Sequence, residues 1–191
     1  MTDITINATD PARWFDKNSF SSTWNSRNAD MLALFDKTIE NAARMSFSEY
    51  GCGPNAPFTA EVAKSSSRKV VRLDMNQWDE GVWAVDLNRE IRDLATTDVG
   101  VFSGVLEYIN NIEKMLESIS GFHTHLLLSY AVRAPLSSFE DFKAAIQHRQ
   151  VKNGWRSHLS TEEVVNTLSK FGFIKAMSAW QDQLIVVIEL Y

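Results

Sequence analysis

The chain has 191 residues, of which 45% are hydrophobic and 23% are charged, a composition that is ordinary for a soluble globular protein. Its net charge of −5 argues against broad binding to nucleic-acid phosphates. No apolar run approaches membrane-spanning length, and the single cysteine excludes an intrachain disulfide and favours a reducing compartment. We therefore expect a cytoplasmic monomer or weak homodimer with no membrane span and no nucleic-acid partner.

Residues 1–44 are predicted to form a polar arm followed by a helix. Residues 1–18 are polar and irregular, and they form the expected arm. Apolar residues then recur at the spacing of one helix face, namely Met31, Leu32, Leu34, Phe35, Ile39, Ala42 and Ala43. We expect this helix to pack on a core formed by residues 45–191, so that 1–191 make a single domain.

The core is predicted to alternate strands with helices. Apolar runs predict strands at 45–50, 69–75, 82–88, 98–103 and 125–131. Helices are expected at 57–64, 112–120, 137–150 and 160–171, and residues 174–180 and 183–191 are expected to form an antiparallel hairpin. Alternation of this kind predicts an α/β fold with a mainly parallel sheet.

Local signals mark the ends of the two later helices. Ser137 with Glu140, and Ser160 with Glu163, have the spacing of a capping box at a helix start. Gly172 is expected to end the second of these helices, because glycine readily adopts the left-handed conformation that stops a helix.

The stretch EYGCGPNAP, residues 49–57, joins the first predicted strand to a helix. Gly51 permits a tight turn, and Gly53 lets the backbone approach a ligand closely. Asp74 ends the second strand 21 positions after Gly53, near the roughly 20 expected between a glycine turn and an acid that binds a ribose. Only 11 residues separate Asp74 from Asp86, so the crossover helix between these strands is expected to be missing or short.

These motifs, taken in order from about Trp24 to Tyr191, resemble the class I S-adenosylmethionine-dependent methyltransferases of the small-molecule type. EYGCGPNAP is similar to the glycine motif of that family, RLDM and VDLN to its second- and third-strand acids, and DVGVFSGVLEYI to its fourth-strand motif. NGWRSHLSTEEVVNTLSKFGF followed by a hairpin is similar to the end of many members. The resemblance implies a Rossmann-like three-layer sandwich whose mainly parallel seven-stranded sheet ends in an antiparallel hairpin. The short second crossover departs from the pattern.

The resemblance also implies that S-adenosylmethionine lies across the carboxyl ends of the strands and is released as S-adenosylhomocysteine. Gly51, Cys52 and Gly53 would pass close to its methionine and ribose parts, and Glu49 would hold the amino group or the turn. The alternative for Glu49 is a carboxylate that pairs with a nearby helix N-terminus. Cys52 is not expected to be a nucleophile, because its small size between two glycines explains it and no histidine partner is placed by the sequence.

Five further residues are implied to bind the cofactor. Asp74 would accept hydrogen bonds from the ribose hydroxyls, and its alternative is a solvated turn residue. Met75 would lie against the adenine or fill the core. Asp86 would take the adenine amino group or cap the segment that begins at Asn88, and Leu87 would wall the ring. Ser103 would lie beside the sulfur, or would simply end its strand.

The acceptor side is less defined by the sequence. Proton-accepting candidates are Glu107, Tyr108, Tyr130 and His158, and His158 is favoured because its ordinary pKa lies nearest neutrality, with a structural role as its alternative. No metal site is expected, because the four histidines lack zinc-type spacing with cysteine. An acceptor wall is expected from Phe139, Phe142, Trp155 and Arg156. Trp24 and Arg27 could cover the cofactor or serve only in packing.

The function predicted from this pattern is methyl transfer from S-adenosylmethionine to a small-molecule acceptor by in-line attack, which depends mainly on positioning. Sugar, lipid-like and natural-product acceptors remain open. The alternatives are a non-catalytic methyltransferase-like binding module and, less favoured, an NAD-binding oxidoreductase that uses the same glycine turn.

Overall fold

A computed structural model of the chain describes residues 15–20, 22–89, 91, 93–134 and 138–191. Its seven strands form one sheet in the order β3-β2-β1-β4-β5-β7-β6. The strands are β1 (Phe47–Tyr50), β2 (Val70–Asp74), β3 (Val82–Ala84), β4 (Val99–Ser103), β5 (His125–Ala131), β6 (Gly172–Trp180) and β7 (Gln183–Leu190). Strands β1 to β5 pair in parallel, whereas β7 is antiparallel to both β5 and β6. The predicted mainly parallel sheet with its final antiparallel hairpin is confirmed.

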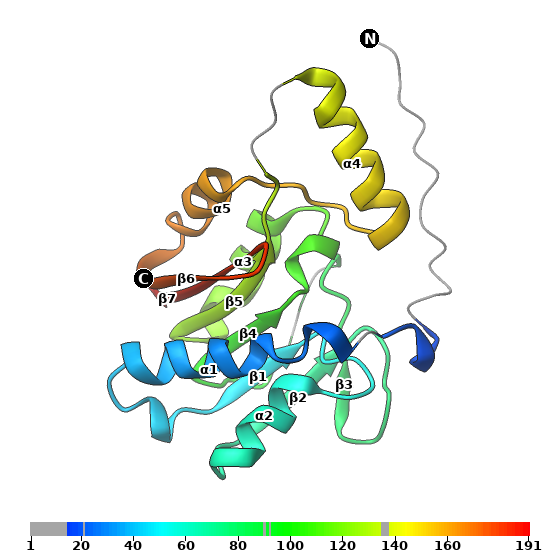
Figure 1. Cartoon of the computed structure of the whole chain (residues 1–191). Helices are drawn as coiled ribbons and strands as arrows, with labels where there is room; N and C mark the ends of the chain where they lie inside the picture. The colour runs from blue at the N-terminus through cyan, green and yellow to red at the C-terminus, as the bar shows by residue number, and fades with distance from the viewer. Residues whose placement is uncertain (1–14, 21, 90, 92, 135–137) are drawn as a thin grey trace.

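Helices cover both faces of this sheet (Figure 1). The described α-helices are α1 (Arg27–Thr38), α2 (Pro57–Ser65), α3 (Ile112–Ile119), α4 (Phe139–Asn153) and α5 (Thr161–Leu168). Single turns of 3₁₀ helix are found at Lys17–Ser19, Ser22–Trp24, Ala42–Arg44, Leu106–Tyr108 and Ser120–Phe122. Helix α4 stands apart from the sheet at the top of Figure 1. None of the helices in the described ranges combines the length and the apolar character needed to cross a lipid bilayer.

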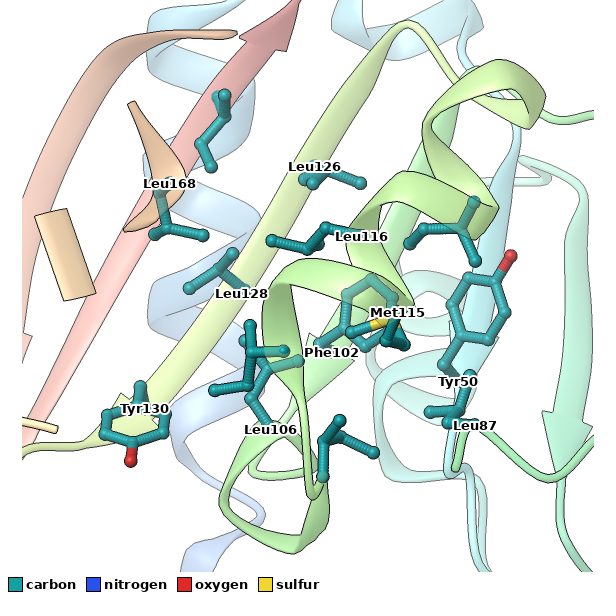
Figure 2. Packing of buried hydrophobic residues seen from close by; sticks show 14 of the residues in the cluster. Tyr50, Leu87, Phe102, Leu106, Met115, Leu116, Leu126, Leu128, Tyr130 and Leu168 are labelled. Carbon is teal, nitrogen blue, oxygen red and sulfur yellow. The ribbon is translucent and has the colours of Figure 1, made fainter. Parts of the chain in front are cut away.

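The core is divided by the sheet into two apolar layers. One layer packs α1 and α2 on one face, through residues such as Phe35, Phe47 and Phe58. The other packs α3 and α5 on the opposite face, and Figure 2 shows Tyr50 and Phe102 of the sheet beneath side chains of α3. Strand side chains alternate between faces, which is why strands β1 and β4 contribute to both layers. This arrangement is the predicted three-layer sandwich.

The N-terminal helix is shorter at its end than its apolar pattern predicts. Helix α1 stops at Thr38, Ile39 is extended, and Asn41 adopts a left-handed φ of 59° before the turn that contains Ala42. Ile39 and Ala42 remain buried with the α1 layer although they lie beyond the helix. The apolar spacing in the sequence therefore continues past the end of the helix and does not show where the helix stops.

Two predicted helix ends also differ. Helix α5 ends at Leu168, and Gly172 is not its stop: Gly172 begins β6, where a Cβ would overlap the backbone carbonyl of Glu189. The capping box of Ser160 and Glu163 is confirmed. Helix α4 is capped by Ser138, whose hydroxyl accepts the Asp141 N–H, whereas the predicted cap Ser137 lies outside the described residues.

The connection from β2 to β3 has no helix, as its length predicts. A loop replaces the helix, and the Arg72 guanidinium fixes it by donating to both carboxylate oxygens of Asp79 at 2.8 and 2.9 Å. Strand β3 ends at Ala84, four residues before the end predicted for it. The freed residues 85–88 turn toward the carboxyl ends of the strands, where they line the cavity described next.

Candidate active site

A cavity of about 320 Å³ opens at the carboxyl ends of the parallel strands. Its walls are the glycine turn after β1, Asp74 at the end of β2, residues 85–88 after β3 and residues 103–105 and 107–109 after β4. Further lining comes from the N-terminal segment, through Phe20, Trp24, Asn25 and Arg27, and from the later residues Asn153, Trp155 and Gln183. In open α/β sheets the strand order changes direction beside the first strand, and ligands bind in the crevice that results.

The glycine turn and Asp74 are joined directly. Gly51 and Gly53 adopt left-handed φ angles of 62° and 61°, which residues with a Cβ rarely adopt. The Gly53 N–H donates to Asp74 Oδ2 at 2.9 Å, and the Asn76 N–H donates to Oδ1 at 3.0 Å. Because each carboxylate oxygen has two acceptor sites, Asp74 can hold the turn and still accept hydrogen bonds from a ligand.

Cys52 lies between these glycines and lines the same wall. Burial, with the carboxylates of Glu49 and Asp74, raises the pKa of the Cys52 thiol well above its usual range. The thiol therefore stays protonated near neutral pH, which makes it a poor nucleophile.

Glu49 does not reach the cavity. Its Oε1 accepts the Phe58 N–H at 3.0 Å, and its Oε2 accepts the N–H and the hydroxyl of Thr59 at 2.9 and 2.6 Å. Helix α2 begins after Ala56, which offers no side-chain cap, so the Glu49 carboxylate satisfies the first free N–H groups of the helix. This is the helix-terminus alternative, and it corrects the expectation that Glu49 holds a cofactor amino group.

The residues expected around the adenine all line the cavity. Met75 is 40% exposed, so it is not core filling, and Leu87 is buried. Asp86 Oδ1 accepts the Asn88 N–H at 3.0 Å, and its other oxygen pairs with the exposed Arg89 at 3.1 Å. Asp86 thus caps the following turn, as its alternative proposed, while it also forms part of the cavity wall.

A group of polar side chains around Arg27 forms the cavity wall at the end of β4. Arg27, the first residue of α1, donates from Nε and Nη2 to Ser103 Oγ at 3.1 and 3.0 Å, and from Nη1 to Gln183 Oε1. The Ser103 hydroxyl donates in turn to Asn28 Oδ1 at 2.6 Å. Ser103 and Arg27 therefore lie on the cavity wall together, and α1 and β7 both contribute to it.

Two of the four proton-accepting candidates line the cavity, Glu107 and Tyr108. Glu107 is 1% exposed, and its Oε1 accepts the Ala131 N–H at 2.7 Å. Its Oε2 has no hydrogen-bond partner among the described residues. Burial raises the pKa of the Glu107 carboxyl, opposed by hydrogen bonds and by Arg27, and such a shift brings a carboxyl closer to the range useful for proton transfer.

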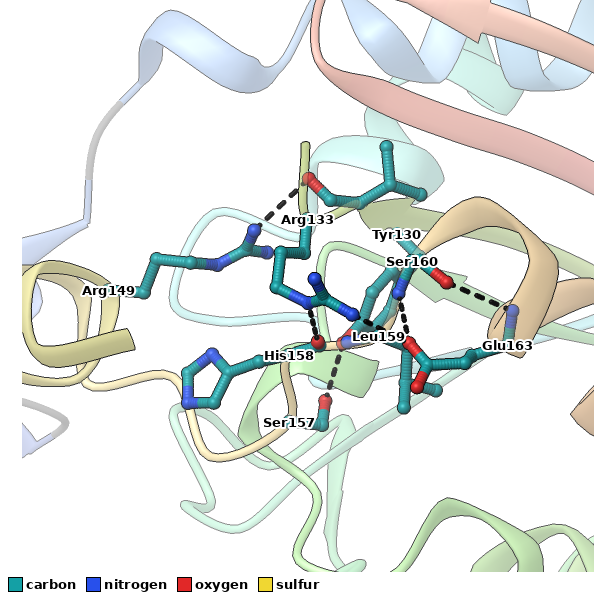
Figure 3. Close-up of polar contacts among 9 residues, drawn as sticks. Tyr130, Arg133, Arg149, Ser157, His158, Leu159, Ser160 and Glu163 are labelled. Carbon is teal, nitrogen blue, oxygen red and sulfur yellow. Dashed lines mark hydrogen bonds and ion pairs between the residues drawn. The ribbon is translucent and has the colours of Figure 1, made fainter. Parts of the chain in front are cut away.

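The favoured base, His158, does not line the cavity. Figure 3 shows its imidazole on the side from which Arg149 approaches. Burial, with Arg149 and Arg133, lowers the pKa of His158 to about 4, so it is a weak base at neutral pH. Tyr130 is also away from the cavity, because its hydroxyl donates to Ser157 Oγ at 3.0 Å and accepts the Leu159 N–H at 2.9 Å. The structure thus corrects both expectations.

Of the four residues expected to form the acceptor wall, the structure places one at the cavity. Trp155 lines the cavity, whereas Arg156 turns to Asn110 Oδ1 at 2.9 Å and does not line it. The side chains of Phe139 and Phe142 lie outside the described ones. Sequence reasoning missed Gln183, for which the one available signal is a glutamine that precedes the apolar run 184–188. Within the described ranges, no group of three or more potential ligands is placed to hold a metal ion.

Comparison with known proteins finds similarity in structure. No family model and no curated protein sequence matches the chain. The structure of the mitomycin 7-O-methyltransferase MmcR matches with a TM-score of 0.67 and 16% identity, over 95% of this chain and 58% of that one. An S-adenosylmethionine-dependent methyltransferase from Mesorhizobium loti matches with a TM-score of 0.62 and 14% identity, over 84% of this chain and 97% of that one.

A third match is a Burkholderia thailandensis 1,6-didemethyltoxoflavin-N1-methyltransferase with 1,6-didemethyltoxoflavin and S-adenosylhomocysteine bound. Its TM-score is 0.60 at 11% identity, over 93% of this chain and 80% of that one. The structures of the pyocyanin biosynthetic protein PhzM and of LaPhzM also match. The chain spans 56% of the length of PhzM and 58% of the length of LaPhzM and of MmcR, a little over half of each. Together with the strand order, these matches show that the chain has the fold of the class I S-adenosylmethionine-dependent methyltransferases.

Proposed function

We propose that the chain is a methyltransferase that moves a methyl group from S-adenosylmethionine to a small-molecule acceptor. The observation that carries this proposal is the shared cavity: the glycine turn, Asp74, residues 85–88 and Ser103 come from four separate strand ends and line one space. The matched structures, several of them small-molecule methyltransferases, support it at the level of the fold.

The residues present fit the cofactor chemically. The remaining acceptor sites of Asp74 suit ribose hydroxyls, since the carboxylate is held in place by Gly53 and Asn76. Met75, Val85 and Leu87 provide an apolar surface for a flat base. When bound, the sulfonium of the cofactor supplies an activated methyl group, and the cavity walls need only align an acceptor with it.

Proton transfer, where an acceptor requires it, falls to Glu107 in this proposal. Its Oε2 is the buried carboxylate oxygen on the cavity wall that has no partner among the described residues. Because its Oε1 is fixed by the Ala131 N–H, the carboxyl group is oriented before the acceptor arrives. An acceptor O–H or N–H that reaches Oε2 would find a carboxylate oxygen with no competing hydrogen bond among the described residues.

The test is calorimetric titration of the wild-type protein with S-adenosylmethionine, S-adenosylhomocysteine and NAD. We expect the first two to bind and NAD not to bind. Binding of NAD alone would overturn the proposal in favour of an oxidoreductase. Tight binding of S-adenosylhomocysteine by a protein that transfers no labelled methyl group to any member of an acceptor library would favour the non-catalytic binding module.

Asp74→Asn tests the ribose contact. Asparagine keeps an oxygen for the Gly53 N–H but loses acceptor capacity, so we expect the Kd for S-adenosylhomocysteine to rise at least tenfold, or about 1.4 kcal/mol. The matched control is Asp79→Asn, which removes a carboxylate paired with Arg72 outside the cavity. The control should leave the Kd unchanged. Equal affinities for all three proteins would refute the placement of the ribose at Asp74.

A further inference from the structure

Helix α4 stands apart from the sheet, yet Arg149 near its end connects it to the cavity (Figure 1). The Arg149 Nη1 donates to the carbonyl of Val132 at 3.1 Å, and its Nη2 donates to the carbonyl of Ala131. The guanidinium carbon also lies 4.6 Å from the ring centroid of Trp155, which lines the cavity. Figure 3 shows Arg149 reaching from its helix toward the chain around Arg133. One side chain therefore joins α4 to the end of β5 and to an aromatic wall of the cavity.

A closed ring of hydrogen bonds passes through Arg149 and Glu107. The Ala131 N–H donates to Glu107 Oε1 at 2.7 Å, while the Ala131 carbonyl accepts from Arg149. The Arg149 carbonyl accepts the Trp155 N–H at 3.3 Å, and the next N–H, that of Arg156, donates to the Glu107 carbonyl at 2.6 Å. Groups in one hydrogen-bonded network are energetically coupled, so a change at Arg149 is expected to reach both the side chain and the backbone of Glu107.

Charge acts along the same connection. Burial raises the pKa of the Glu107 carboxyl, whereas the positive charges of Arg27 and Arg149 lower it from two sides. Arg149 forms no ion pair with another described residue, since its hydrogen bonds go to backbone carbonyls. Its charge therefore remains available to favour the ionised form of Glu107, which is the form that can accept a proton.

We propose that Arg149 is a positioning residue that orients Glu107 and holds Trp155 in place at the cavity wall. The inference rests on the proposed function, in which Glu107 accepts the proton of the methyl acceptor, and it adds α4 to the elements that build the site. A guanidinium suits this role because its terminal nitrogens can donate in one plane to two neighbouring carbonyls while its flat face covers an aromatic ring.

Two NMR signals of the full-length protein, recorded without any ligand, report the two parts of the proposal. The carboxyl carbon of Glu107, observed after isotopic labelling of glutamate and assigned by its loss in Glu107→Gln, gives the pH at which this group titrates. The indole N–H of Trp155, assigned by its loss in Trp155→Phe, gives the order parameter of the ring, which measures its motion on the picosecond to nanosecond timescale.

Arg149→Gln is the first variant. Loss of the positive charge should raise the pH at which Glu107 titrates, and the order parameter of the Trp155 indole should fall from about 0.85 to below about 0.6. The matched control is Arg156→Gln, which removes the same charge from an exposed side chain that turns to Asn110 and keeps the backbone N–H bound by Glu107. The control should leave both signals at their wild-type values. A folded Arg149→Gln protein in which either signal matches the wild type overturns the proposal.

Arg149→Lys is the second variant, and it decides the question if glutamine prevents folding. Lysine keeps the charge but cannot donate to two carbonyls from one plane or cover the Trp155 ring with a flat group. We expect Glu107 to titrate nearer to its wild-type pH than in Arg149→Gln, and the Trp155 indole to become mobile. An ordered Trp155 indole in the folded lysine variant overturns the proposal. If neither variant folds, Arg149 has a structural role instead, and the proposal is likewise overturned.

Failure of the proposed function gives a different result. Neither NMR signal requires the cofactor, so a wild-type protein that binds no S-adenosylhomocysteine can still show both effects of Arg149. The arrangement of Glu107 and Trp155 then belongs to a site for another ligand. A protein that binds S-adenosylhomocysteine but shows neither effect has the proposed cofactor without a positioning role for Arg149.

Discussion

Gly53 shows how one residue can serve both the backbone and the cavity. Its φ of 61° is left-handed, its N–H holds Asp74, and a Cβ at this position would lie 3.1 Å from Cε1 of Phe20, which lines the cavity. The requirement for glycine is therefore conformational and steric at once.

Gly53→Ala should lower the free energy of unfolding by about 1–2 kcal/mol, because alanine pays the cost of a left-handed backbone. It should also weaken S-adenosylhomocysteine, since Phe20 must shift and the bond to Asp74 is disturbed. Urea unfolding and calorimetry measure the two effects. Gly121→Ala is the matched control: a Cβ there meets no atom within 4 Å, so both quantities should stay near wild type.

At the scale of elements, helix α5 depends on its first turn. The Ser160 hydroxyl accepts the Glu163 N–H at 3.3 Å, and Glu163 Oε2 accepts the Ser160 N–H at 2.7 Å. Ser160→Ala should cost about 0.5–2 kcal/mol of unfolding free energy, because the helix that presents Val164 and Leu168 to the core loses its cap. Denaturant unfolding measures this cost.

Ser118→Ala provides the comparison for that loss. Its exposed hydroxyl donates only to the carbonyl of Lys114 within α3, a bond that contributes little to helix stability. We expect an unfolding free energy within about 0.5 kcal/mol of wild type for this variant. Equal losses in the two serine variants would mean that the cap of α5 carries no special stability.

The elements that the sequence predicts well are those marked by local signals. Strand β5 is found at its exact bounds, and the capping box places the start of α5 correctly. The end of α1 is not marked, because Ile39 and Ala42 stay buried after the helix stops, and burial is what the apolar pattern reports. The predicted length of strand β3 is too long for a related reason. Val85 and Leu87 lie beyond the strand, where their apolar side chains contact the cavity and the adjoining core.

The site divides in the same way. Residues at strand ends, such as Asp74 and Ser103, are placed by topology, because parallel strands bring their carboxyl ends to one edge. Residues whose role depends on distant neighbours are not. His158 is defined by Arg133 and Arg149, which lie on other segments and lower its pKa, and Gln183 reaches the cavity because β7 inserts beside β5. No spacing in the sequence reports either contact.

At the scale of the whole molecule, a buried polar chain links strand β1 to the segments that lead into β4 and β5. The Tyr50 hydroxyl lies 2.8 Å from His123 Nε2, and His123 Nδ1 lies 3.1 Å from the carbonyl oxygen of Thr97. Since a carbonyl only accepts, Nδ1 donates to it, and the neutral ring accepts the Tyr50 O–H at Nε2. The Thr97 hydroxyl continues the chain to Ser48 at 2.9 Å. A protonated His123 would break this arrangement.

Burial lowers the pKa of His123 below its ordinary value of 6.5, so the folded state holds the ring neutral while the unfolded state takes up a proton below that pH. The contribution of His123 to the free energy of unfolding is therefore fully present above about pH 6.5. It is lost as the pH falls below that value, by up to about 1.4 kcal/mol per pH unit. The buried carboxyls of Glu49 and Glu107, whose pKa values are raised, act in the opposite direction, but they do so equally in a His123 variant.

His123→Gln isolates the histidine contribution, because glutamine can donate and accept but does not titrate. The variant should be less stable than wild type at pH 7.5, since an amide fits the ring site imperfectly. The difference in unfolding free energy should then shrink as the pH is lowered to 5.5, because only the wild type loses stability through this group. Urea unfolding of both proteins at half-unit pH steps measures the difference. If the unfolding free energies of the two proteins changed in parallel with pH, His123 would have the same pKa in the folded and unfolded chains. Its burial would then impose no penalty on protonation of the ring.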